Sequence, residues 1–289
     1  MIGVHEDNNI GALSVIKDVF IKNNYFFEES LLFGFAGGAS YHLIEKVTNK
    51  NSMVKTYYVS SYPYNMLQNI CINFGIHHEI WDYKLIERNK EKIANKLEFG
   101  VCLFVNEIMS VTDMEKNFCY KWGNILNLDA DLLTVNVRMS DKSSDEEWDI
   151  CSKKVTVHCL HFPEITQKYN KKLKKIIYSN SFRFLHQKEE NWNISGINNL
   201  LNNFTEEDIV IEHDFVKNDM NRKLYSKFIN DMCLYLEDSF YEKVSKLYIK
   251  SSNLWKVFFT IDESKICKIS CLKEIYELEK KANELLMEH

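Results

Sequence analysis

The stretch "FFEESLLFGFAGGASYHLIEK" (residues 26–46) is an apolar, aromatic run in which three glycines stand close together. Gly34, Gly37 and Gly38 do not form a Walker phosphate loop, because no Gly-Lys-Ser/Thr follows them. No clear strand precedes them either, which disfavours a dinucleotide-binding loop. Close backbone packing or a tight turn is the simpler interpretation of this spacing.

A polar segment and a predicted helix come before this run, in "HEDNNIGALSVIKDVF" (residues 5–20). Apolar residues recur there at helical spacing, at positions 10, 13, 16, 19 and 20. Asp7, Asn8 and Asn9 can each accept hydrogen bonds from the free N–H groups of the first helical turn. The same N–H groups and the helix dipole also attract thiolates, oxyanions and phosphates. The sequence therefore leaves two interpretations, a simple helix cap or the edge of an active site.

The composition is that of a globular chain. Its 289 residues are 45% apolar and 27% charged, which suits one large or two modest domains with a sizeable core. The net charge of −5 argues against a nucleic-acid partner, and no run reaches the roughly 18 apolar residues of a membrane span. No signal peptide is predicted, and the eight scattered cysteines suit reduced, buried thiols. We therefore expect a cytoplasmic protein with no membrane partner.

The predicted elements change character along the chain. The first part alternates helices and strands, whereas the pattern becomes almost continuously helical after about Phe162. Asp129 and Asp131 mark the turn of a hairpin. This order predicts an α+β first part and a helical second part, with a boundary near 165–180. The expected strands are 55–62, 101–108, the two halves of 124–141, and 153–162; the expected helices include 64–76 and 84–100.

The densest group of possible metal ligands lies in "CSKKVTVHCLH" (residues 151–161). In a strand His158 and Cys159 point to opposite faces, so only Cys159 and His161 share one. No second Cys or His pair at zinc-ligand spacing completes the set, so we expect no metal and no cofactor. Two further candidates are interpreted structurally: the pair His77-His78 as a surface turn, and Cys119, in an aromatic run, as packing rather than a nucleophile.

The order of these segments resembles the butirosin biosynthesis protein H family. Residues 29–38 match the glutamate, the bulky run and the glycines that follow the first helix in that family. Further motifs follow in the family's order: "MLQNICINFGI", "KEKIANKLEFG", "VCLFVNE", "NILNLDAD…VRMSD", and then the helical "SGINNLL" and "RKLYSKFINDM". The resemblance implies a papain-like cysteine-protease fold, an α+β domain with an antiparallel sheet at residues 1–170. It also implies an all-helical domain at residues 171–289.

The resemblance further implies a site that has lost its reactive groups. Asn8 stands where the family has its nucleophilic Cys, and Asn124 stands where it has its His base. A carboxamide forms hydrogen bonds, but it neither attacks a thioester nor shuttles a proton near pH 7. Asp141 takes the place of the aspartate that follows, and His5 is a further candidate to assist catalysis. The substrate-binding positions implied beside them are Asp7, Glu29, Gly37 and Gly38.

Two functions follow from the resemblance. In the first, the protein transfers an acyl group from an acyl carrier protein or a small-molecule thioester to an amine in natural-product biosynthesis. Even without a thiol, a site that holds thioester and amine together accelerates the reaction by proximity and oxyanion stabilisation. In the second, the protein is a catalytically inactive homologue that acts as a ligand-binding or scaffold protein. Should the resemblance be accidental, the glycines are packing residues of an unrelated globular protein.

The helical part also carries more apolar surface than one helix usually buries. This surface suggests a homodimer, and the alternative is that it packs onto the first domain. The residues concerned are Phe228, Leu234, Leu236 and Tyr241.

Overall fold

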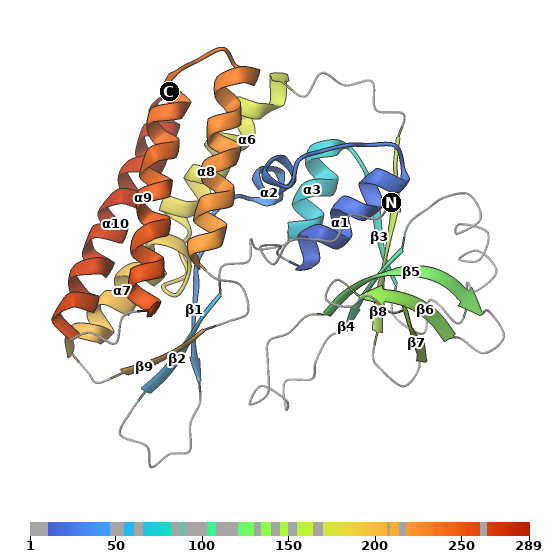
Figure 1. The fold of residues 1–289 in the computed structure, drawn as a ribbon, viewed down its shortest axis with the longest axis horizontal. Coiled ribbons are helices and arrows are strands. Elements are labelled where there is room, and N and C mark those ends of the chain that lie inside the picture. Colours follow the sequence, from blue (N-terminus) through green and yellow to red (C-terminus); the bar gives the residue numbers. More distant parts are fainter. Residues whose placement is uncertain are drawn as a thin grey trace. The chain divides into compact units, whose positions relative to one another are not determined.

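A computed structural model gives the fold of the chain (Figure 1). It describes the backbone of residues 11–46, 55–60, 66–81, 88, 103–107, 121–129, 134–139, 145–149, 155–163, 170–206, 209–213, 218–260 and 265–289. Side chains are described for residues 13–43, 66–80, 88, 158–163, 172–204, 211, 219–260 and 265–289.

The chain forms two compact units, and each is made of two separate stretches of sequence. The first unit contains Met1–Leu32 and Leu67–Thr166, and the second contains Phe33–Met66 and Gln167–His289. The division falls inside helix α2 (Glu29–Ala36). The boundary expected at 170/171 stays a prediction about which parts of the chain fold independently.

Helices α1 (Gly11–Lys22) and α3 (Met66–Phe74) supply the described core of the first unit. The buried ring of Phe20 is its centre, and four aromatic rings surround it with centroids 5.0 to 6.4 Å away. Most of these rings meet edge to face, which aligns the positive edge of one ring with the negative face of the other. The four rings are those of Tyr25, Phe27, Phe74 and Phe162.

The first unit also contains a six-stranded antiparallel sheet with the strand order β3-β8-β4-β5-β6-β7. The β5–β6 hairpin has a bulge between Ile125 and Asn127. The strands are β3 (His77–Trp81), β4 (Leu103–Glu107), β5 (Lys121–Asp129), β6 (Thr134–Met139), β7 (Asp145–Asp149) and β8 (Val155–His161).

Five helices dominate the second unit, and α8, α9 and α10 run side by side in it (Figure 1). In α9 the buried residues recur every three or four positions, from Tyr241 through Tyr248 and Trp255 to Phe258, so one face of the helix is buried along its length. The helices are α6 (Asn170–His186), α7 (Asn193–Glu206), α8 (Asn218–Tyr235), α9 (Phe240–Thr260) and α10 (Lys265–Glu288).

A three-stranded sheet belongs to the same unit. Strand β2 (Lys55–Ser60) lies between β1 (His42–Lys46), to which it is antiparallel, and β9 (Ile209–His213), to which it is parallel. Backbone hydrogen bonds between β2 and β9 thereby join the two stretches of sequence that form this unit. Helix α7 packs against β1.

The expected papain-like α+β fold is wrong. Among the residues with described side chains, 76% lie in helices, and within the six-stranded sheet such residues belong only to β3 and β8. The physical reason lies in β1 and β2. They pair with each other, and β2 pairs with β9 from the helical part of the chain, so neither extends a sheet of the first part. Local predictions fared better: α1, α3, β2, β4, the β5–β6 hairpin and β8 are confirmed. The predicted helix 84–100 lies almost wholly outside the described residues.

The proposed dimer surface is partly internal. Phe228 and Tyr241 are buried within the helical unit, whereas the Leu234 side chain is 82% exposed. A homodimer stays a prediction, but Phe228 and Tyr241 are not part of its surface. In the described part of the chain, no helix combines the length and the apolar character needed to cross a membrane.

Candidate functional site

Three predicted catalytic residues, His5, Asn8 and Asp141, lie outside the described residues, and so does Asp7, a predicted substrate-binding residue. Asn124 lies in β5, where its backbone is paired with Phe104 of β4 and Arg138 of β6; its side chain is outside the described part. The predicted arrangement of Asn8 opposite Asn124 therefore stays a prediction.

Glu29 begins helix α2, and its carboxylate lies 3.8 Å from the ammonium group of Lys17 in α1. The side chains are 18% and 29% exposed. A carboxylate in the first helical turn also interacts favourably with the helix dipole. These contacts give Glu29 a structural role in addition to the substrate-binding role predicted from the resemblance.

Gly37 and Gly38 end helix α2. The N–H of Gly38 donates to the carbonyl of Phe33, and the N–H of Gly37 donates to that of Gly34, which is the hydrogen-bond pattern of a Schellman cap. The φ angles of Gly37 and Gly38 are 130° and 71°, a region that side chains disfavour. A Cβ atom on Gly38 would lie 2.4 Å from the ring of Tyr225. This glycine therefore serves the turn and the close approach of α8.

The segment around these glycines, residues 34–41, is held by polar contacts from three helices. Asn180 of α6 donates to the carbonyl of Gly34 at 2.8 Å, and Arg222 of α8 donates to the carbonyl of Ser40 at 2.7 Å. Tyr41 and Asn193 exchange two hydrogen bonds, of 3.1 and 2.7 Å. Each of these groups is buried, so the contacts fix the path of the loop.

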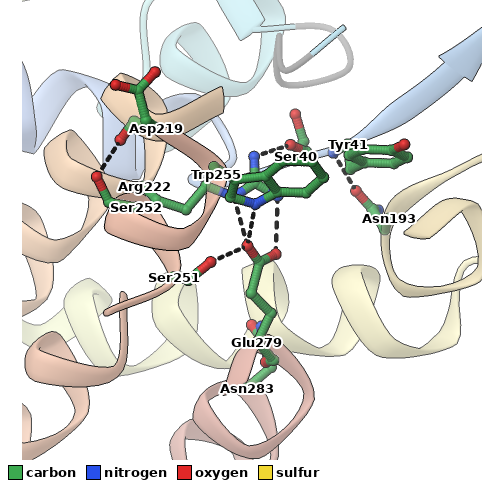
Figure 2. Close-up of polar contacts among 10 residues, drawn as sticks. All are labelled: Ser40, Tyr41, Asn193, Asp219, Arg222, Ser251, Ser252, Trp255, Glu279 and Asn283. Carbon is green, nitrogen blue, oxygen red and sulfur yellow. Dashed lines mark hydrogen bonds and ion pairs between the residues drawn. The ribbon is translucent and has the colours of Figure 1, made fainter. Parts of the chain in front are cut away.

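Arg222 and Glu279 form a buried ion pair beneath this loop (Figure 2). Both side chains are fully buried, and the guanidinium donates two hydrogen bonds to the carboxylate, of 2.8 and 2.9 Å. Ser251 and Trp255 of α9 also donate to Glu279 Oε1, at 2.5 and 2.9 Å. The ion pair is thus satisfied by groups of the protein itself, and both of its side chains are closed off from solvent. We interpret this group, which we name the closed centre, as structural.

Three tyrosines pack around the closed centre: Tyr41, Tyr225 and Tyr248. Burial is the main cause that raises the pKa of each phenol well above its ordinary value. All three phenols therefore stay protonated at neutral pH and add no charge to the closed centre.

The described thiols include two that are poorly suited to nucleophilic catalysis. Burial raises the pKa of Cys71 to about 12, and burial is also the main cause that raises the pKa of Cys233. A nucleophilic cysteine needs the opposite shift, because the thiolate is the reactive form.

A second polar group lies on the β3–β8 strand pair of the first unit. The pairing register sets His77 opposite His161 and Glu79 opposite Cys159, and alternation puts all four side chains on one face. Glu79 Oε1 lies 3.3 Å from His77 Nε2 and 3.2 Å from His161 Nε2, and Cys159 Sγ lies 3.6 Å from His161 Nε2. We name these four residues the open centre, because the His77 side chain is 70% exposed.

The opposite face of the same strands carries His78 and His158. Their rings stack, and His78 Nε2 lies 3.0 Å from His158 Nδ1. Burial lowers the pKa of His158 to about 4 and also lowers that of His78, with a further contribution from the neighbouring histidine in each case. Both rings are therefore neutral near pH 7, and one can donate the hydrogen bond that the other accepts.

A groove of about 300 Å³ lies within the helical unit, between α6, α7 and α10. This volume is at the lower end of the range for small-molecule sites. Leu185, Ile194, Tyr276 and Met287 supply its apolar lining, and its polar groups are those of His186, Lys280, Glu284 and Glu288. A much smaller cavity of about 10 Å³ beside Gly37 and Ser40 has room for about one water molecule.

The sequence interpretation missed both the open centre and the groove. Strand alternation predicted that Cys159 and His161 share a face, which is confirmed. The interpretation of His77-His78 as a surface turn was wrong, because both residues lie in β3. A usable signal was the matching spacing of His77-x-Glu79 and Cys159-x-His161, two ligand pairs that could face each other. The groove has no such local signal, since three helices build it.

Comparisons with known proteins do not identify this arrangement. No protein-family model matches the chain, and no curated protein sequence matches it. The resemblance to the butirosin biosynthesis protein H family therefore stays a prediction from the residues quoted above.

Proposed function

We propose that the protein binds a small amphipathic amine in the α6–α7–α10 groove and acts on it in acyl transfer or amide-bond formation. The observation that carries the proposal is the combination of an apolar lining with two carboxylates that lie one turn apart on α10. The acyl donor would be a carrier-protein or small-molecule thioester, as expected from the sequence resemblance. The proposal does not depend on a papain-like fold, and it places the reaction in the cytoplasm.

The charges of the groove favour an ammonium group. Glu284 and Glu288 follow each other by one turn at the C-terminal end of α10, where the helix dipole is negative. Lys280 is one turn earlier, so the groove has two carboxylates and one ammonium of its own. A monovalent cation therefore balances the lining. Leu185, Ile194 and Met287 offer an apolar surface to the body of the ligand.

Isothermal titration of the full chain with n-heptylamine, heptanoate and heptanol tests the binding step. We expect heptylamine to bind more tightly than the other two, because only it pairs its charge with the carboxylates. The Glu284→Gln/Glu288→Gln variant should bind heptylamine about tenfold more weakly, as expected for two partly exposed ion pairs. Glu277→Gln is the matched control, because this exposed residue of α10 is not part of the groove lining.

Mass spectrometry of the products of heptylamine and an acyl N-acetylcysteamine thioester tests the chemical step. Amide formed faster with protein than without it supports acyl transfer, and the Glu284→Gln/Glu288→Gln variant should reduce this rate. Retained turnover in that variant would contradict the binding of the amine in the groove. Binding without turnover would leave the alternative, a non-catalytic ligand-binding protein. Equal affinity for amine and carboxylate would overturn the proposal itself.

A further inference from the structure

Four side chains with metal-binding atoms meet on the β3–β8 face, and they come from two pairs far apart in sequence. His77 and Glu79 are two residues apart in β3, and Cys159 and His161 are two residues apart in β8. The antiparallel register makes the pairs direct neighbours, His77 opposite His161 and Glu79 opposite Cys159. Directly opposed side chains on one face of a sheet have Cβ atoms about 4.5–5.5 Å apart. The strand pairing therefore places four possible metal ligands next to one another on one face of the sheet.

Three of the six separations between their ligand atoms are close to the edges of a tetrahedral zinc site. With Zn–N, Zn–O and Zn–S bonds of about 2.0–2.3 Å, the tetrahedral N···O edge is about 3.4 Å and the N···S edge about 3.6 Å. The two N···O distances at Glu79 Oε1 are 3.3 and 3.2 Å, and the Sγ–Nε2 distance between Cys159 and His161 is 3.6 Å. Charge-assisted hydrogen bonds between N and O are usually shorter, about 2.7–2.9 Å.

The atoms used in these contacts argue against a catalytic triad. A nucleophile–His–carboxylate triad uses both ring nitrogens of the histidine, one toward each partner. Here the same atom, His161 Nε2, contacts both the carboxylate of Glu79 and the thiol of Cys159. One nitrogen directed at a space shared by an oxygen and a sulfur is the arrangement of a metal ligand. The thiol of Cys159 is also fully buried, which suits a ligand better than a nucleophile.

We propose that His77, Glu79, Cys159 and His161 bind a zinc ion. Imidazole, carboxylate and thiolate are all zinc ligands, and a four-coordinate set of this kind closes a tetrahedral site. Among the described residues, no three His, Cys, Asp or Glu side chains are already placed to hold an ion. Zinc binding therefore requires side chains of the open centre to rotate. The His77 ring is free to do so because its side chain is 70% exposed. This proposal is independent of the amine-binding groove.

Metal titration of the full chain tests the proposal. After treatment with a chelator, the protein is titrated with Zn²⁺ against a colorimetric competitor and, separately, with Co²⁺ under absorbance detection. We expect one ion per chain, release of a proton from the thiol, and a Co²⁺ spectrum with thiolate charge-transfer and tetrahedral d–d bands. Cys159→Ser should remove the charge-transfer band. Glu79→Gln and His161→Gln should each weaken Zn²⁺ binding by more than about 100-fold, the upper limit seen when only an outer-shell partner is lost.

Two further variants keep the test decisive. His78→Gln, on the opposite face of β3, is the matched control and should leave zinc affinity unchanged. His77→Ala replaces an exposed side chain and should fold normally, yet it should weaken zinc binding. The proposal would be overturned if Cys159→Ser and His161→Gln bound zinc as tightly as the wild-type protein does. It would also be overturned if the Co²⁺ complex of the wild-type protein had no thiolate charge-transfer band. The absence of any ion bound above the affinity of the competitor would overturn it as well.

Discussion

The closed centre in the helical unit and the open centre on the β3–β8 face each contain a glutamate carboxylate in contact with nitrogen groups, but they differ in burial. In the closed centre, Arg222 and Glu279 are fully buried, and Glu279 accepts hydrogen bonds from Arg222, Ser251 and Trp255. In the open centre, the side chains of Glu79 and His161 are 27% and 31% exposed, and that of His77 is 70% exposed.

This difference separates a structural role from a binding role. A buried charge is tolerated only where the protein itself satisfies it, which leaves nothing for a ligand. A partly exposed cluster keeps some of its groups in contact with solvent, as Glu79, His77 and His161 are here, and a metal or ligand can replace that solvent. The comparison predicts that changes in the closed centre act on stability, whereas changes in the open centre act on binding.

Glu279→Gln should have the largest effect, a loss of about 3–5 kcal/mol in the free energy of unfolding. The change removes the negative charge and leaves the Arg222 guanidinium buried without compensation. Urea denaturation followed by circular dichroism measures the effect. If this variant does not fold, Ser251→Ala provides a milder test. It removes one hydrogen bond to the carboxylate and should cost about 1.5–3 kcal/mol. The double variant Arg222→Met/Glu279→Leu should recover much of the loss, and a double variant as unstable as Glu279→Gln would contradict this explanation.

On the opposite face of β3 and β8 from the open centre, His158 is buried and its partner His78 is half-buried, so we expect changes there to act on stability. The folded-state pKa of His158 is about 4, below the ordinary 6.5, so the unfolded chain binds its proton more readily. This contribution to stability is complete above pH 6.5 and is lost as the pH falls toward 4. It amounts to about 3 kcal/mol for a shift of this size.

Urea denaturation at pH 7 and at pH 4 measures this dependence. His158→Gln keeps a hydrogen-bonding side chain without a titrating group. The wild-type protein should lose about 3 kcal/mol more than this variant between the two pH values. Equal losses would show that the histidine pair does not couple protonation to folding.

Gly38→Ala tests how closely the glycine loop is fitted to α8, next to the closed centre. The new methyl group would lie 2.4 Å from the Tyr225 ring, which is itself packed against Phe228 and Tyr248. We expect a loss of about 2–3 kcal/mol from backbone strain and overpacking together. Gly75→Ala is the matched control. Gly75 has a similar φ of 73°, but its Cβ would meet nothing within 4 Å, so thermal denaturation should show a loss of only about 1 kcal/mol from the backbone term.

The glycine run illustrates what the sequence could predict. Its interpretation as close packing or a tight turn is supported at Gly34 and Gly38, where a Cβ would overlap the rings of Phe228 and Tyr225. The sequence could not name those partners, which lie nearly 200 positions later. Predictions from periodicity, such as α3 and its end at Gly75, were accurate because they depend on neighbouring residues.

Long-range pairing explains where the fold prediction failed. The parallel pairing of β2 with β9 joins residues 55–59 to residues 209–213, and the sequence pattern of neither segment predicts this pairing. The open centre was missed for the same reason, since the register of β3 against β8 decides which histidines share a face with Cys159. A polar pair at i and i+2 in each strand was visible, but only the pairing makes the two pairs one site.

Glu79→Gln should have the smallest effect on stability, and it is the counterpart of Glu279→Gln. The same chemical change at the open centre removes a carboxylate whose imidazole partners are partly exposed, so metal-free protein should lose less than about 1 kcal/mol. Urea denaturation of both variants after chelator treatment makes the comparison direct. With Zn²⁺ in excess, the wild-type protein should gain stability by mass action and Glu79→Gln should gain much less. A loss at Glu79 as large as that at Glu279 would mean that the open centre is held together as tightly as the closed one. Exposure would then be no guide to which charged group binds a ligand.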